Sequence, residues 1–97
     1  MISIIYTDDG EKRTLTVQGH GPGPKGKDIF CAGASALAIT LEANLHNEDI
    51  PYDISVDDGY AKIESSAAES KAIYNHCVQG YLQLEEMYPT QYRVTTL

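Results

Sequence analysis

Cysteine and basic residues are both scarce in this sequence, and each scarcity excludes a class of function. The chain has only two cysteines in 97 residues, and neither belongs to a C-x-x-C or another short spacing of metal ligands. Seven Lys and Arg residues stand against fourteen Asp and Glu residues, for a formal net charge of −7. Because proteins bind phosphate groups through Lys and Arg, this balance disfavours nucleic acid as a direct partner. We therefore expect no metal site, no cofactor and no direct nucleic-acid binding.

Long apolar runs are missing as well. No run approaches the ~20 apolar residues needed to cross a bilayer, and the first residues lack the basic and apolar regions of a signal peptide. We therefore predict a cytoplasmic protein without membrane contact, a setting that disfavours a disulfide. At 97 residues the chain has the size of a single domain, residues 1–97. Its small core would make dimerisation a useful addition to stability.

Hydrophobic periodicity predicts an α+β domain in the order ββαββαβ. Five strands are predicted at 2–7, 14–18, 52–57, 60–64 and 91–96, and two helices at 28–46 and 67–88. We expect both helices to pack on one face of a mainly antiparallel sheet.

Turn and cap residues mark the boundaries of these elements. Asp58-Gly59 is a strong hairpin signal, and we interpret Asp57 and Asp58 as a solvent-exposed turn rather than as paired catalytic carboxylates. Ser65 or Ser66 is expected to cap the second helix, with Glu69 completing a capping box if Ser66 is the cap. Cys77 falls on the apolar stripe of that helix and is predicted to belong to the core.

A glycine- and proline-rich stretch joins a lone histidine to a lone cysteine. His20 follows the second predicted strand, and Asp28 is a preferred N-cap residue that would place Cys31 in the first turn of the first helix. Unpaired backbone N–H groups and the helix dipole favour an anion at that position, so a thiol there can act as a nucleophile near neutral pH. The two residues therefore fit a thiol nucleophile and its base. A buried structural cysteine and a structural histidine fit the same residues.

Several neighbouring residues can support such a pair. Ser35 lies one helical turn after Cys31, where its hydroxyl can bond near the sulfur or to the carbonyl four residues earlier. Gly21, Gly23 and Gly26 would allow the loop to close over a bound peptide, so we predict that they form a substrate loop.

One pattern includes both reactive residues with their flanks: Gly19-His20, Gly26, Asp28-Ile29 and the run CAGASAL at 31–37. This pattern resembles the signature of the bacterial ribosomal-processing cysteine protease family. A weaker similarity extends along the chain to the segment LQLEEMY at 82–88. The resemblance implies a small homodimeric cysteine protease of α/β build. It also implies removal of a short N-terminal extension from large-subunit ribosomal protein L-twenty-seven.

Carried over onto this sequence, the resemblance implies that Cys31 is the nucleophile and His20 the acid and base, with Asp28 and Ser35 in supporting positions. Asp28 has two candidate roles. It can be the N-cap of the first helix, which is the role we favour, or the third residue of a catalytic triad, which would orient His20. The loop at 21–27 is shorter and richer in proline than is usual in the family.

We therefore predict a cysteine endopeptidase whose partner is a protein substrate, a ribosomal protein with an N-terminal extension. Two alternatives fit the same sequence. One is a dimeric, non-enzymatic interaction protein of the same fold, and the other is a phage-type relative that processes a capsid or scaffold protein.

Overall fold

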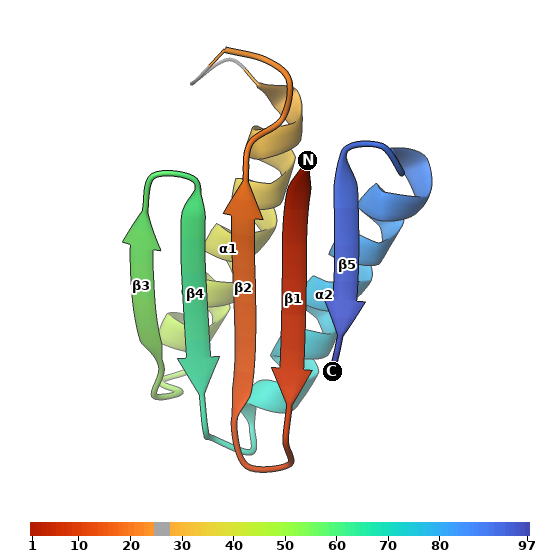
Figure 1. The fold of residues 1–97 in the computed structure, drawn as a ribbon. Helices are drawn as coiled ribbons and strands as arrows, with labels where there is room; N and C mark the ends of the chain where they lie inside the picture. The colour runs from red at the N-terminus through yellow and green to blue at the C-terminus, as the bar shows by residue number, and fades with distance from the viewer. Residues whose placement is uncertain (25–27) are drawn as a thin grey trace.

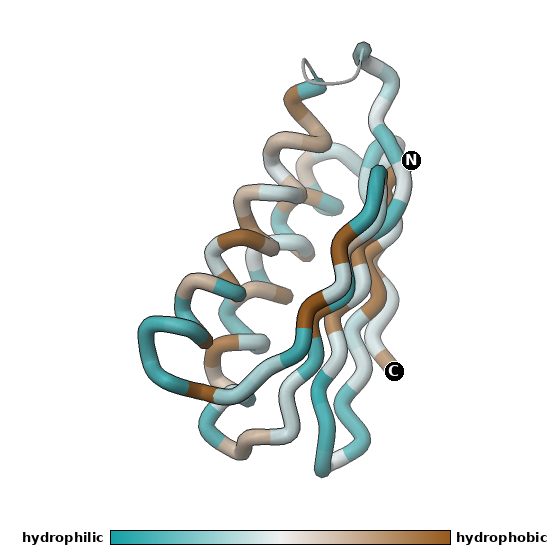
Figure 2. Tube along the Cα trace, turned by 90° about the vertical axis from the view of Figure 1, so that its left-hand side faces the viewer, coloured by the Kyte–Doolittle hydropathy of each residue, from teal (hydrophilic) through white to brown (hydrophobic). Residues whose placement is uncertain are grey.

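A computed structural model describes residues 1–24 and 28–97 of the chain. Its elements in chain order are β1 (Ile2–Asp8), β2 (Arg13–Gly19), α1 (Ile29–Asn47), β3 (Asp53–Asp57), β4 (Tyr60–Ser65), α2 (Ser70–Met87) and β5 (Tyr92–Thr96). Both helices pack on the same face of the sheet (Figure 1, Figure 2). The predicted single α+β domain with the order ββαββαβ is confirmed.

The five strands form one sheet in the order β3-β4-β2-β1-β5. Three neighbouring pairs are antiparallel, and β1 with β5 is the one parallel pair in the described part of the chain. A parallel pair needs a crossover connection, and α2 provides it by returning the chain across the sheet to β1 (Figure 1). The prediction of a mainly antiparallel sheet is thus confirmed, with β3 and β5 as its two edges.

The core lies between the sheet and the two helices. Alternate residues of the inner strands face the helices, as a period of two requires. The buried apolar residues include Ile2, Ile4, Leu15 and Ile63 from the sheet, Ala34, Ala38, Leu41 and Leu45 from α1, and Tyr74, Cys77, Val78 and Tyr81 from α2. The predicted core position of Cys77 is confirmed.

Two buried tyrosines of α2 tie the layers together by hydrogen bonds as well as by packing. Tyr81 donates its hydroxyl to the carbonyl oxygen of Ala34 in α1 at 2.7 Å, and Tyr74 donates to that of Ile63 in β4 at 3.0 Å. Each bond satisfies a phenol that would otherwise be buried without a partner. α1 is therefore held at a defined place on the sheet.

α1 combines small residues with an apolar composition. By length and composition alone it is apolar enough to cross a membrane, with a mean hydropathy of 1.3 over 18 residues. The lack of a long apolar run did not predict this, because Ala, Cys, Leu and Ile raise the average even where Gly and polar residues interrupt them. The core helix of a soluble protein meets the same criterion, and four residues of α1 are buried against the sheet and α2.

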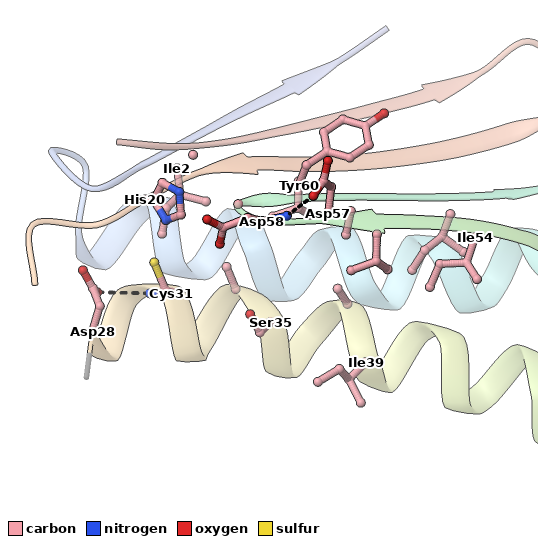
Figure 3. Close-up of a pocket in the computed structure, with 18 of the residues that line it drawn as sticks. Ile2, His20, Asp28, Cys31, Ser35, Ile39, Ile54, Asp57, Asp58 and Tyr60 are labelled. Atoms are coloured by element: carbon pink, nitrogen blue, oxygen red, sulfur yellow. Dashed lines mark hydrogen bonds between the residues drawn. The ribbon is translucent and has the colours of Figure 1, made fainter. Parts of the chain in front are cut away.

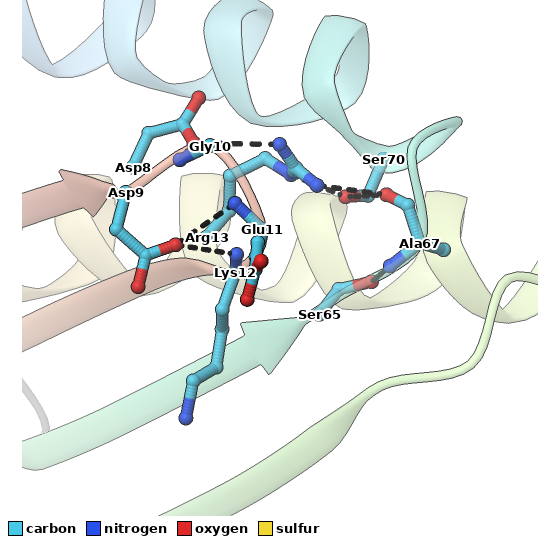
Figure 4. Close-up of polar contacts among 9 residues, drawn as sticks. All are labelled: Asp8, Asp9, Gly10, Glu11, Lys12, Arg13, Ser65, Ala67 and Ser70. Atoms are coloured by element: carbon cyan, nitrogen blue, oxygen red, sulfur yellow. Dashed lines mark hydrogen bonds and ion pairs between the residues drawn. The ribbon is translucent and has the colours of Figure 1, made fainter.

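The predicted start of the second helix is wrong. α2 begins at Ser70, and its N-cap residue Glu69 makes no capping hydrogen bond with its side chain. The side chain of the buried Arg13 makes hydrogen bonds to this region instead. Its Nε donates to Ser70 Oγ at 2.9 Å, and its Nη2 donates to the Ala67 carbonyl oxygen at 3.2 Å (Figure 4). Ser65 Oγ accepts from the Ala67 amide at 3.3 Å, which closes a short turn before the helix.

Candidate active site

His20 is positioned by the end of β2 and by the β3–β4 hairpin. Gly19, with φ +107°, donates its N–H to the carbonyl oxygen of Gly59 in the hairpin turn at 2.9 Å. The ring of His20 then lies against Gly59, where Nε2 occupies the space that a Cβ would need. The amino group of Met1 donates to the His20 carbonyl oxygen at 3.1 Å. These contacts place an exposed imidazole at the mouth of a cleft.

Cys31 is positioned by the N-cap of α1. Asp28 Oδ1 accepts from the amides of Phe30 at 2.8 Å and Cys31 at 3.1 Å, and Oδ2 accepts from the amide of Gly23 at 2.7 Å. Burial alone would raise the pKa of Asp28, but these amides and the nearby His20 lower it below its ordinary value. The predicted N-cap is present, and both of its oxygens are engaged by backbone N–H groups.

Two of the glycines predicted to form a substrate loop contact the first turn of α1 and its N-cap. The amide of Gly21 donates to Cys31 Sγ at 3.2 Å. Gly21 also lies so close to the Asp28 carboxylate that a Cβ would overlap it. Gly21 and Gly23 thus contact the two ends of the same helical turn, whereas Gly26 lies outside the described residues.

The first turn of α1 is also held from the side opposite the cleft. Tyr92 of β5 donates its hydroxyl to the carbonyl oxygen of Phe30 at 2.7 Å. The Phe30 ring packs edge-on against Tyr88 and Tyr92, with centroid separations of 5.2 and 6.0 Å. The residue beside Cys31 is therefore fixed by the last strand of the sheet.

His20 and Cys31 face one another across the mouth of the cleft, with Sγ directed from α1 toward the imidazole (Figure 3). The topology brings His20, Asp28 and Cys31 together, because β2 ends near the start of α1. Ser35 lies one turn further along α1, exposed and lining the same cleft. Within residues 1–24 and 28–97 its hydroxyl makes neither of the two hydrogen bonds predicted for it.

The cleft has a volume of about 610 Å³ and runs between α1 and the β3–β4 hairpin. Asp57 and Asp58 line it, and Asp58 points toward His20 (Figure 3). Both residues are exposed in the hairpin turn, as predicted, but the sequence did not indicate that this turn lies beside His20. The turn belongs to the cleft because Gly19 is bonded to Gly59.

The family model for "Cysteine protease Prp" matches residues 1–93 of the chain. The chain belongs to the Prp cysteine protease family. Comparison with curated proteins gave no match. The family assignment agrees with the resemblance seen around His20 and Cys31.

Solved structures share the Prp fold over the full length of this chain. An essential ribosomal processing protease Prp from S. aureus, in complex with a covalently linked product peptide, is 28% identical with a TM-score of 0.88, and both chains are covered completely. The structure of that protease with a substrate peptide is 27% identical with a TM-score of 0.83, again with complete coverage of both chains. The protein SMU.848 from Streptococcus mutans is 25% identical with a TM-score of 0.84, over 100% of this chain and 97% of that one.

The protein is therefore a cysteine protease, and its two thiols differ sharply. Cys31 is partly exposed in the cleft, whereas Cys77 is buried. Burial raises the pKa of the Cys77 thiol to about 12, so it stays protonated and unreactive at neutral pH. No cluster of three His, Cys, Asp or Glu side chains that could hold a metal ion occurs in the described part of this Prp-family chain.

The sequence did not predict the walls of the cleft beyond the reactive pair and its neighbours. Ile39 and Glu42 come from α1, and Ile54 and Val56 come from β3. Ile39 is 65% exposed and Val56 71% exposed, which is unusual for large apolar side chains. Ile54 and Val56 alternate with polar residues along β3, but only the strand order shows that they lie at the sheet edge beside the site.

Proposed function

We propose that this protein is an endopeptidase in which Cys31 attacks the peptide carbonyl and His20 transfers the proton. Its proposed substrate is a ribosomal protein with an N-terminal extension, of the L-twenty-seven type. The observation that carries the proposal is the position of the Cys31 sulfur: in the first turn of α1, directed toward His20, and bonded by the Gly21 amide.

The chemistry follows from this arrangement. The Cys31 thiolate adds to the substrate carbonyl carbon while His20 holds the proton as an imidazolium. Collapse of the tetrahedral adduct breaks the C–N bond, and His20 gives its proton to the leaving amine. Water, deprotonated by the neutral His20, then attacks the thioester. The second tetrahedral adduct collapses with cleavage of its C–S bond, so the carboxylic acid product leaves and the cycle ends with the Cys31 thiolate and the His20 imidazolium.

The oxyanion donor suggested by the geometry is the Gly21 amide. The amides of Phe30 and Cys31 already bond Asp28 Oδ1, and the Ala32 amide bonds the Asp28 carbonyl oxygen. Gly21 N–H bonds the sulfur before reaction. Once the sulfur has bonded carbon, this N–H can donate to the adjacent oxyanion, a contact that favours the transition state.

The ribosomal substrate is supported by charge and by the comparisons. A net charge of −7 suits a basic protein substrate. The S. aureus relative is described as a ribosomal processing protease and binds a substrate peptide. The predicted homodimer and cytoplasmic location form part of the same proposal.

The direct test mixes the protein with L-twenty-seven carrying its N-terminal extension and measures the product mass. Wild-type protein and Cys77→Ala should both release the extension, whereas Cys31→Ala and Cys31→Ser should release none and keep the fold. Cleavage by Cys31→Ala at the wild-type rate would show that the nucleophile is assigned wrongly. Binding without cleavage by wild-type protein would favour the interaction protein, and cleavage of a capsid or scaffold protein alone would favour the phage-type relative.

The role of His20 has its own test. His20→Ala should slow cleavage by about 10²–10⁴-fold, the usual effect of losing a general acid or base. Iodoacetamide should alkylate Cys31 more slowly in His20→Ala than in wild-type protein at the same pH, because the imidazole no longer assists the thiol. Equal alkylation rates in the two proteins would mean that His20 does not influence the sulfur, and the paired mechanism would fail.

A further inference from the structure

The two edge strands of the sheet, β5 and β3, differ in whether their outward backbone groups are covered. At one edge, the outward amide of Val94 in β5 donates to Glu85 Oε2 of α2 at 2.7 Å, so this edge is closed to another strand. At the other edge, all five residues of β3 are exposed, and no strand of the described chain lies beyond it. An open edge beside an active-site cleft is a ready place for an extended peptide.

The register of the hairpin identifies which groups this edge presents. Asp57 pairs with Tyr60 across a two-residue turn, so the N–H and C=O groups of residues 53, 55 and 57 point toward β4. Alternation along the strand then directs the N–H and C=O groups of Ile54 and Val56 outward. These two residues are the ones available for pairing with an added strand.

The side chains of the same two residues line the cleft. Ile54 lies opposite Ile63, which is buried under the helices, and Val56 lies opposite Ala61. Both therefore project toward the helix side of the sheet, where Ile39 of α1 forms the other wall. Figure 3 shows this apolar part of the cleft continuing along α1 from His20 and Cys31.

We propose that the substrate peptide binds as an additional strand on the edge of β3. Its backbone would bond the outward groups of Ile54 and Val56, and an apolar side chain would pack among Ile39, Ile54 and Val56. The inference rests on the proposed protease function and names the substrate class: an extended segment that has apolar residues at alternate positions and no proline where it pairs. Strand pairing would align the peptide with Cys31 without relying on its full side-chain sequence.

The sharpest variant is Val56→Pro, which removes the outward N–H. Proline is tolerated on an edge strand when its missing N–H faces solvent, and the preceding Ser55 already has the extended conformation that proline requires. Val56→Ala is the matched control, because it shortens the side chain and keeps the N–H. For a peptide spanning the L-twenty-seven cleavage site, Val56→Pro should lower kcat/KM roughly 3- to 10-fold beyond Val56→Ala, the effect of one net hydrogen bond.

A second measurement does not depend on the proline variant folding. Hydrogen exchange of the Ile54 and Val56 amides in Cys31→Ser protein should slow when the same peptide is added, while that of the Val94 amide should not change. Iodoacetamide should label Cys31 equally fast in Val56→Pro and wild-type protein, which reports an intact site.

The outcomes separate the two proposals. Cleavage by wild-type protein with no amide protection, together with equal kcat/KM for Val56→Pro and Val56→Ala, overturns strand pairing and leaves the protease function standing. A wild-type protein that neither binds nor cleaves the peptide overturns both.

Discussion

Gly59→Ala tests the position of His20 through a residue that takes no part in the chemistry. Gly59 has φ +66°, a left-handed conformation that side chains disfavour. Its missing Cβ also leaves the space filled by His20 Nε2. An alanine there would strain the hairpin turn and push the imidazole out of its place opposite Cys31.

The two effects can be separated with Gly10→Ala. Gly10 has φ +92°, and a Cβ on it would meet nothing within 4 Å. Left-handed backbone costs a non-glycine residue roughly 1–2 kcal/mol, so both variants should lose similar stability. For a small domain, each 1 kcal/mol lost lowers Tm by about 4–8 °C. Only Gly59→Ala should also lower kcat/KM, on the order of 10²-fold if His20 moves by about 1 Å.

The assay measures peptide cleavage and thermal unfolding of both variants in the same buffer. Gly10→Ala should have the wild-type kcat/KM and a lower Tm. Gly59→Ala should have both a lower kcat/KM and a lower Tm. Equal kcat/KM for the two variants would refute the reasoning, because it would mean that His20 works without its contact with the hairpin.

Three further predictions concern the core and the far end of the sheet. Tyr81→Phe removes the hydroxyl that bonds the Ala34 carbonyl oxygen, so urea unfolding should show a loss of about 0.5–1.5 kcal/mol. Arg13→Met removes a charged donor from Ser70 and should cost about 1.5–3 kcal/mol by urea unfolding with unchanged kcat. Burial raises the pKa of Cys77 from 9.0 to about 12, so the unfolded state loses this proton first, and stability should fall as pH rises through that range. In pH-dependent unfolding, the fall should be smaller for Cys77→Ala; an identical fall would contradict this role.

Local signals predicted most of what positions the two proposed catalytic residues, His20 and Cys31. Asp28 before an apolar helix identified the N-cap that places Cys31, and alternation up to Gln18 placed His20 at a strand end. Both signals act within a few residues, where spacing and capping chemistry decide the structure.

The parts that were missed depend on contacts between distant segments. The β3–β4 hairpin was recognised as a hairpin, but nothing local indicates that it pairs with β2 and brings Asp58 toward His20. The start of α2 was predicted wrongly because Arg13, 57 residues before Ser70, bonds the hydroxyl of that residue. Strand order and long-range polar contacts of this kind are set by the packing of the whole domain.

The hydrogen bond from Tyr92 to Phe30 joins residues 62 positions apart. The turn that carries Cys31 therefore depends on β5 as well as on its own N-cap. β5 is held in the sheet by its pairing with β1. Local opening of that edge strand would remove the rear support of the turn, even where the antiparallel strands stay paired.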